Sequence, residues 1–210
     1  MIAEIAVVGG ERIDTAQVRA LSLLRVGDRW TPIVRDRALQ ALRSLPAVRD
    51  VQISTQRLRR GEVRVVVELQ EREPFGLVAL EDDIYWIDRD GYLLEPASAF
   101  PPPPEFPPVQ GVSVEDTPRG RRVTPERVRG LLREFFALDG RTLARIRALR
   151  VRPYDVEVEL RGGKRVYLPL RGWRGSLERL WRAAAALEAA GKGDWHVLDL
   201  RVEGEVTVRR

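Results

Sequence analysis

One stretch, residues 63–74, reads Val-Arg-Val-Val-Val-Glu-Leu-Gln-Glu-Arg-Glu-Pro. Its first half is dense in β-branched residues and in part alternates apolar with polar, a pattern that predicts a half-buried strand. Its second half, Gln70–Glu73, is too charged for burial to be expected, and Pro74 lacks the N–H that a ladder requires. The stretch therefore predicts the last strand of one domain, 1–70, which continues directly into a second domain, 71–210.

The residues before this stretch predict two further strands and two helices. Asp14-Thr15-Ala16-Gln17 has the spacing of a capping box, and Thr31-Pro32 places an N-cap before a proline at the first helical position. The order β-α-α-β-β predicts a three-stranded sheet with both helices on one face and its last two strands antiparallel. The remaining elements are the strand Ile2–Val8, a strand beginning at Val48, and the turn Arg59-Arg60-Gly61 that leads into Val63.

Residues 71–210 predict a larger, mostly antiparallel β domain with two helices, so the fold class is α+β. The helices are expected to begin at Thr124-Pro125-Glu126 and at a capping Ser176. Between them Gly162-Gly163 predicts a two-residue hairpin turn. Pro96–Pro108 carries seven prolines without helical or strand period, which indicates a stiff, extended loop that wraps the sheet. Arg119, Arg121 and Arg122 are expected in a solvated loop.

The amino-acid composition limits which kinds of binding surface, metal site and membrane segment the chain can contain. The net charge is +5, but 36 basic residues face 31 acidic ones, and the interleaving of the two signs argues against a nucleic-acid-binding surface. Nearly all basic residues are arginine and asparagine is absent, a composition typical of a protein from a hot, GC-rich bacterium. Without cysteine, neither a disulfide nor a thiolate metal site can form. The longest apolar run, Ala183–Leu187, is far short of the ~20 residues that cross a bilayer.

The residues needed for catalysis do not occur in a usable pattern. The one histidine, His196, lies between Trp195 and Val197 with no carboxylates at ligand spacing. None of the six serines stands in a Gly-x-Ser-x-Gly elbow, and there is no Walker loop or Gly-x-Gly-x-x-Gly. The sequence therefore predicts no enzyme, no catalytic residue, no metal site, no cofactor and no small-molecule substrate.

Several short motifs occur in an order that resembles one known family. Glu71-Arg72-Glu73-Pro74 resembles the Glu-Arg-x-Pro junction of the bacterial division proteins FtsQ and DivIB. Phe106-Pro107-Pro108-Val109-Gln110-Gly111 is similar to their Leu-Pro-x-Leu-x-Gly segment, with phenylalanine and valine in place of the leucines. Asp199-Leu200-Arg201 is similar to a motif near the family's C-terminus. The resemblance implies a POTRA domain, 1–70, a β domain, 71–210, and a domain junction at Glu71, Arg72 and Pro74.

The resemblance also implies a function and a location. It implies a non-enzymatic scaffold of the divisome, a single-pass inner-membrane protein whose extracytoplasmic part lies at the septum. Its partners would be the coiled-coil proteins FtsB and FtsL, and through them the septal peptidoglycan synthases FtsW and FtsI. Such proteins carry a transmembrane helix before the POTRA domain, so Met1 is expected to be an artificial start within a longer chain.

The C-terminal strand, 205–210, is the predicted partner site. A strand at the end of a chain has no successor to cover it, so its outer backbone groups can pair with a partner strand. The resemblance implies that FtsB adds a strand there. Leu198, Leu200 and Val202 are expected to face inward, as are Val206 and Val208, and Thr207→Pro is expected to weaken binding about a hundredfold. The predicted protein-binding residues are Arg201, Val202, Glu203, Gly204, Glu205, Val206, Thr207, Val208 and Arg209.

Two alternatives from other classes stay open. A POTRA-containing secretion or outer-membrane assembly factor is expected to show repeated POTRA units or a barrel pattern, and one unit is visible. An arginine-rich nucleic-acid-binding module is expected to show a steep dependence of affinity on salt.

Overall fold

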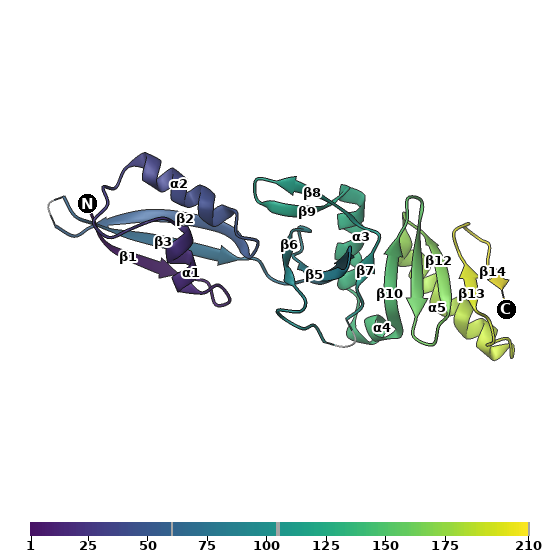
Figure 1. Cartoon of the computed structure of the whole chain (residues 1–210). Helices are drawn as coiled ribbons and strands as arrows, with labels where there is room; N and C mark the ends of the chain where they lie inside the picture. Colours follow the sequence, from purple (N-terminus) through teal and green to yellow (C-terminus); the bar gives the residue numbers. More distant parts are fainter. Residues whose placement is uncertain (60, 104–105, 210) are drawn as a thin grey trace. The chain divides into compact units, whose positions relative to one another are not determined.

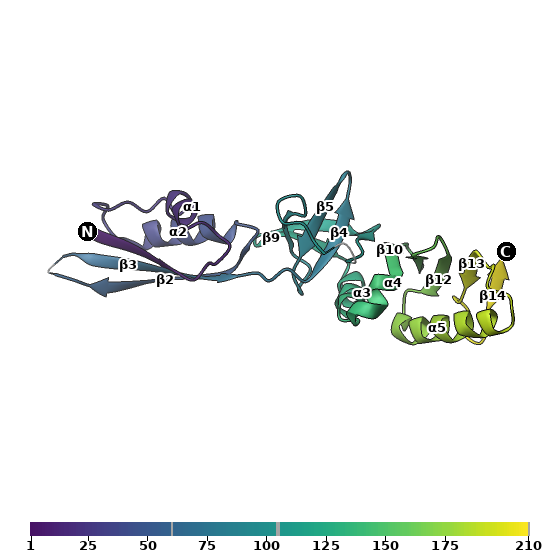
Figure 2. The same ribbon diagram turned by 90° about the horizontal axis from the view of Figure 1, so that it is seen from below.

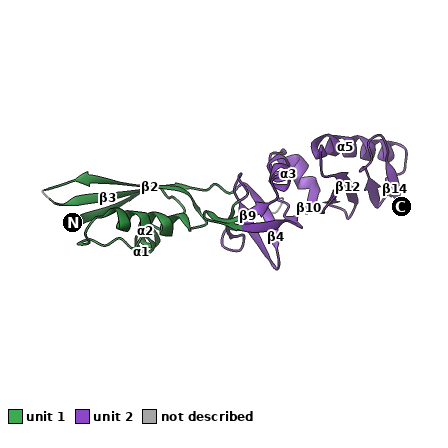
Figure 3. Cartoon of the chain, turned by 90° about the horizontal axis from the view of Figure 1, so that it is seen from above, with its two compact units in different colours: residues 1–74, 92–94, 116–122 green, residues 75–91, 95–115, 123–210 purple. Residues whose placement is uncertain are grey.

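The computed structural model describes residues 1–59, 61–103 and 106–209 (Figure 1). Four residues of the predicted elements lie outside the described residues: Arg60 of the expected turn, Pro104 and Glu105 of the proline-rich stretch, and Arg210 of the terminal strand. The chain forms two compact units (Figure 3). Unit 1 comprises Met1–Pro74, Tyr92–Leu94 and Asp116–Arg122, and unit 2 comprises Phe75–Gly91, Glu95–Glu115 and Val123–Arg210. In the ranges that the structure describes, no helix is long and apolar enough to cross a bilayer.

Unit 1 is a three-stranded sheet with two helices on one face (Figure 2). Its strand order is β1-β3-β2, and β3 runs parallel to β1 and antiparallel to β2. The central position of β3 follows from its valines, because Val65, Val66 and Val67 are all buried although neighbouring residues point to opposite faces. The elements are β1 (Ile2–Val8), α1 (Thr15–Leu21), α2 (Pro32–Arg43), β2 (Val48–Arg57) and β3 (Val63–Glu71).

The helices of unit 1 begin where the capping residues predict. The Asp14 carboxylate accepts a hydrogen bond from the Ala16 N–H at 2.9 Å. The Thr31 hydroxyl accepts one from Val34 N–H at 3.3 Å, and Pro32 follows at the first helical position. Each cap satisfies a backbone donor that a helix start leaves unpaired. The two helices then bury Val18, Ala38 and Leu42 against the sheet.

Unit 2 is built on a nine-stranded mixed sheet in the order β14-β13-β12-β11-β10-β7-β4-β5-β6. The predicted α+β class is confirmed, although the β12–β13, β10–β7 and β4–β7 pairs are parallel. A separate hairpin, β8–β9, holds Arg121 and Arg122 in a strand, so the loop predicted for these two is wrong, whereas Arg119 lies exposed in the turn between the strands. The strands are β4 (Gly76–Leu80), β5 (Asp83–Ile87), β6 (Leu93–Pro96), β7 (Val109–Gln110), β8 (Ser113–Thr117), β9 (Gly120–Thr124), β10 (Ile146–Val151), β11 (Asp155–Leu160), β12 (Arg165–Pro169), β13 (Val197–Asp199) and β14 (Thr207–Arg209).

Three helices accompany this sheet, one more than the sequence predicts. They are α3 (Glu126–Phe136), the short α4 (Gly140–Arg145), whose cap is Asp139, and α5 (Trp173–Ala189). Neither predicted cap is confirmed, because Pro125 precedes α3 without a side-chain hydrogen bond and α5 begins three residues before Ser176. The Ser176 hydroxyl is buried and donates back to the Gly172 carbonyl at 3.4 Å. Gly172 starts this helix from the left-handed conformation, φ 65°, which glycine adopts without steric cost.

Contacts of aromatic residues hold the proline-rich stretch against the rest of unit 2. Trp86 Nε1 donates to the Phe100 carbonyl at 2.7 Å, and the Trp86 ring lies 5.9 Å from the Phe106 ring. Phe106 in turn stacks on Phe136 with 5.3 Å between ring centroids. A Cβ atom at Gly76 would approach the Phe136 ring to 2.3 Å, so only glycine leaves room for that ring. The aromatic residues, more than the prolines, therefore hold the described part of this loop.

The junction motif is a set of internal contacts within unit 1. The Glu71 carboxylate accepts from the backbone N–H groups of Arg12 and Ile13 at 2.9 and 2.7 Å. Arg72 is only 2 % exposed, which corrects the expectation that this charged segment avoids burial. Its guanidinium donates to the carbonyls of Val48 and Arg119 at 3.1 and 3.4 Å and lies 3.8 Å from the Tyr92 ring. These partners satisfy the buried donors and explain why Glu71–Pro74 belongs to unit 1.

Candidate functional site

The terminal hairpin β13–β14 forms one edge of the sheet in unit 2. β14 pairs antiparallel with β13, with Asp199 opposite Thr207, Leu198 opposite Val208 and Val197 opposite Arg209. It is the outermost strand of the order, so no strand formed by the described residues lies on its far side. The structure thus places Thr207, Val208 and Arg209 in the predicted edge strand, whereas Glu205 and Val206 belong to the connection before it.

The strand before the turn is shorter than the sequence predicts. Leu198 and Leu200 are fully buried, as expected from alternation. Val202 is 56 % exposed and Val206 49 %, so the prediction that both face the core is wrong. The reason is that the strand ends at Asp199, and the chain turns at Glu203-Gly204, where Gly204 has φ 81°. Once the strand has ended, its two-residue period no longer decides which side chains are buried.

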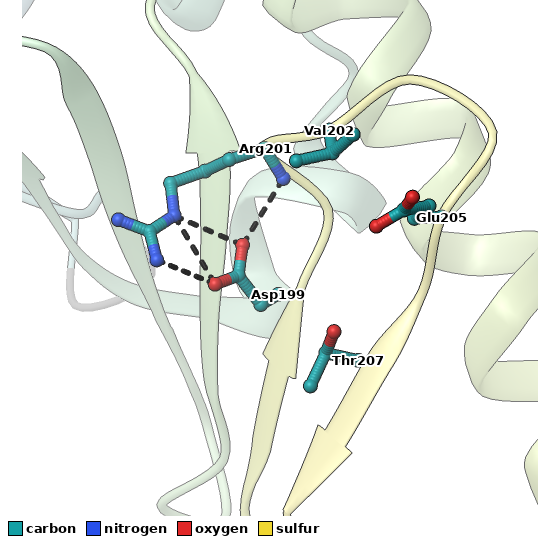
Figure 4. Close-up of a pocket in the computed structure, with 5 residues that line it drawn as sticks. All are labelled: Asp199, Arg201, Val202, Glu205 and Thr207. Carbon is teal, nitrogen blue, oxygen red and sulfur yellow. Dashed lines mark hydrogen bonds and ion pairs between the residues drawn. The ribbon is translucent and has the colours of Figure 1, made fainter.

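Arg201 connects β13 with β11 at the base of this turn, and Figure 4 shows its contacts with Asp199. Its Nε donates to Asp199 Oδ1 at 2.9 Å, and its Nη1 donates to Asp155 Oδ2 on β11 at 2.9 Å. The side-chain hydrogen bond from Arg201 lowers the pKa of Asp199 below its usual value of 3.8. The two carboxylates raise the pKa of Arg201, which is charged at any physiological pH. The cluster therefore orients the start of the turn by charge-assisted hydrogen bonds.

Arg179 of α5 holds the rest of the turn. Its Nη2 donates to the Val202 carbonyl at 3.0 Å, to that of Glu205 at 3.3 Å and to that of Leu200 at 3.5 Å. One guanidinium thus fixes the backbone on both sides of Glu203-Gly204. Sequence reasoning did not identify Asp155 or Arg179, which lie 46 and more than 20 residues from their partners. No local pattern marks either residue.

The surface beside β14 is an open pocket of about 300 Å³. It is lined by Asp199, Arg201, Val202, Glu205 and Thr207 (Figure 4). Within the described part of the chain, no three His, Cys, Asp or Glu side chains gather as a metal site would require. The histidine of the sequence, His196, is exposed just before β13. The groups of this edge that are available for binding are therefore exposed side chains and the backbone of a strand.

The backbone N–H and C=O groups of β14 are directed alternately toward β13 and toward the open side of the sheet. The Arg209 carbonyl accepts from the His196 N–H at 2.9 Å, so Arg209 directs its backbone polar groups toward β13. In an antiparallel ladder successive residues alternate in this direction, so Thr207 also faces β13. Val208 consequently directs its N–H and C=O groups to the open side. Unpaired groups of this kind are a template for a further strand.

Acid is expected to loosen this hairpin. A carboxylate whose pKa is lowered in the folded state contributes stability above its unfolded-state value of about 3.8, and the contribution is lost as pH falls through the lower folded pKa. Amide exchange of Thr207 and Arg209 should therefore accelerate, relative to β10 amides, as pH falls below about 4. In Asp199→Asn this extra acceleration should disappear. An unchanged pH profile in that variant would show that Asp199 does not hold the hairpin.

Among the comparisons with known proteins, the family match extends as far as Arg201, so it includes β13 but not β14. The family model "Cell division protein FtsQ/DivIB, C-terminal" matches residues 76–201, more than half of the chain. The chain belongs to the FtsQ/DivIB family of cell division proteins. A solved structure is also similar, the major extracytoplasmic domain of the trans isomer of DivIB from Geobacillus stearothermophilus. Its identity is 18%, its TM-score is 0.39, and the match covers 57% of this chain and 97% of that one. A search of the curated proteins finds no match.

Membership of the FtsQ/DivIB family gives the chain a role in cell division. The family consists of non-enzymatic divisome components. A secretion or outer-membrane assembly factor and a nucleic-acid-binding module, the two alternatives, belong to other families.

Proposed function

We propose that this FtsQ/DivIB protein is a divisome scaffold that receives a strand of an FtsB/FtsL-type protein on the free edge of β14. Through that complex it regulates FtsW/FtsI-like septal peptidoglycan synthases. The chain acts at the septum as the periplasmic portion of a single-pass inner-membrane protein from a thermophilic bacterium. Its parts are a POTRA domain, 1–70, and a β domain, 71–210, with no small-molecule or nucleic-acid ligand.

One observation carries this proposal, the outward direction of the Val208 backbone on the outermost strand. Strand addition obtains affinity from main-chain hydrogen bonds and specificity from the side chains that flank them. Here the flanking side chains are Thr207 and Arg209, both exposed, and Glu205 in the adjacent pocket. The Arg179 and Arg201 contacts hold the turn before β14 in place, which reduces the ordering cost of binding.

Replacing Val208 with proline is expected to weaken partner binding about ten- to a hundredfold. Proline removes the outward N–H, and its ring occupies the space that the partner's carbonyl would need. Proline is tolerated on an edge strand whose N–H faces solvent, so the free protein should keep its fold. Calorimetric titration with the extracytoplasmic segment of the FtsB-like protein from the same organism measures the effect.

Val208→Ala is the matched control, because it shortens the side chain and keeps the N–H. It should bind within a few-fold of the parent chain. Thr207→Pro differs in kind, since Thr207 faces β13 and its replacement removes a hydrogen bond of the protein's own ladder. It should release β14 in the free protein, seen as faster amide exchange. Equal affinity of Val208→Pro and Val208→Ala would rule out pairing along this edge.

A further inference from the structure

Two loops of unit 1 meet at the start of β1 (Figure 1). The connection between α1 and α2 is held there by two backbone hydrogen bonds of 2.8 Å, from Ile2 N–H to the Asp28 carbonyl and from Gly27 N–H to the Ile2 carbonyl. On the other side, β1 pairs with β3, so the turn after β2 lies next to it, with Val63 N–H bonded to the Met1 carbonyl at 3.0 Å. Residues 23–29 and 57–59 therefore share one end of unit 1, which we name the loop end.

The loop end exposes large apolar side chains. Leu23 is 56 % exposed, Val26 64 % and Leu58 49 %. Leu23 also has φ 57°, in the left-handed region that non-glycine residues seldom adopt. A glycine would fit this position without strain, and the leucine gains little burial in the free protein in return. An exposed leucine in a strained conformation indicates a contact that the free chain does not contain.

The same loops carry arginines without an acidic partner. Arg25, Arg29, Arg57 and Arg59 are exposed, and among residues 1–59, 61–103 and 106–209 no carboxylate forms an ion pair with them. By contrast, the half-buried Arg64 on β3 forms an ion pair with Glu4 at 3.3 Å. Unpaired cations beside exposed leucine and valine at a loop tip suit the boundary between lipid headgroups and acyl chains.

We propose that the loop end binds the surface of a bilayer containing anionic lipid, with Leu23, Val26 and Leu58 entering the interface and the four arginines contacting headgroup phosphates. Juxtamembrane arginines are attracted to such surfaces, and apolar tips add burial that a purely electrostatic contact lacks. The inference extends the proposed membrane location to a direct lipid contact. It concerns residues other than the β14 edge and is tested without the partner.

The test is co-sedimentation of the full chain with vesicles. The chain should bind vesicles of equimolar phosphatidylglycerol and phosphatidylcholine and not vesicles of phosphatidylcholine alone. Arg25→Gln combined with Arg29→Gln should lower the affinity about tenfold or more, and so should Leu23→Asp combined with Val26→Asp. The matched controls lie in unit 2 and should bind like the parent: Arg147→Gln with Arg150→Gln, and Tyr154→Asp, whose side chain is 91 % exposed.

Leu23→Gly separates a lipid contact from a structural role. It should raise the midpoint of chemical denaturation, because glycine accepts φ 57° without strain, and at the same time weaken vesicle binding. Vesicle binding that is unchanged in all loop-end variants, or absent altogether, would overturn the proposal. The proposal would also be overturned if the chain bound duplex DNA but not the vesicles, and if the arginine variant lost this DNA binding. Failure here leaves the Val208→Pro result on partner binding unaffected.

Discussion

Replacing Phe136 with alanine should lower the free energy of unfolding of unit 2 by about 3–5 kcal/mol. Phe136 is 7 % exposed, and its ring contacts Phe75, Phe106 and Phe135 at centroid distances of 6.1, 5.3 and 5.0 Å. Removing it opens a cavity among three other rings, which can fill the space only by moving away from their own contacts. Guanidinium titration followed by tryptophan fluorescence measures the loss, since Trp86 lies 5.9 Å from Phe106.

Phe100→Ala is the matched control for this prediction. Phe100 belongs to the same cluster, 5.9 Å from Trp86, but its side chain is 57 % exposed. Its carbonyl, which accepts from Trp86 Nε1, remains in the variant. The control substitution should lower the free energy of unfolding by less than about 1 kcal/mol. If Phe136→Ala and Phe100→Ala lowered the free energy of unfolding by the same small amount, Phe136 would not hold the proline-rich stretch against the rest of unit 2.

Replacing Arg72 with methionine should destabilise unit 1 by about 2–4 kcal/mol. Methionine keeps much of the side-chain volume, but the Val48 and Arg119 carbonyls lose their donors at 3.1 and 3.4 Å, and Tyr92 loses its stacked guanidinium. A buried acceptor left without a partner costs about 1–3 kcal/mol. Denaturant titration measures the effect through Trp30, which packs against the core of this unit. Because Arg72 is buried, added salt should change the loss little.

Arg119→Met provides the comparison. The Arg119 side chain is exposed, and its backbone carbonyl stays available to Arg72 in the variant. The free energy of unfolding of this variant should lie within about 0.5 kcal/mol of that of the parent chain. If Arg72→Met lowered the free energy of unfolding no more than Arg119→Met does, the arginine of the junction motif would have no structural role.

Elements whose evidence lies within a few residues were predictable from the sequence. The order of strands and helices in unit 1 follows from the periodicity of its apolar residues, and the starts of its helices follow from Asp14 and Thr31. The α+β class and the open position of the last strand followed in the same way. Caps and amphipathic periods act over three or four residues, so a local stretch contains all that is needed.

Other features depended on residues far apart in the chain, and only the tertiary structure decided them. The two residues of β7, Val109 and Gln110, form a strand because β4 and β10 lie on either side of them. Arg72 is buried because Val48, Arg119 and Tyr92 supply its contacts. The exposure of Val202 follows from the end of β13, and the turn beyond it is held by Arg179 of α5. Burial and pairing are properties of neighbours in space, which a strand period or a propensity scale does not contain.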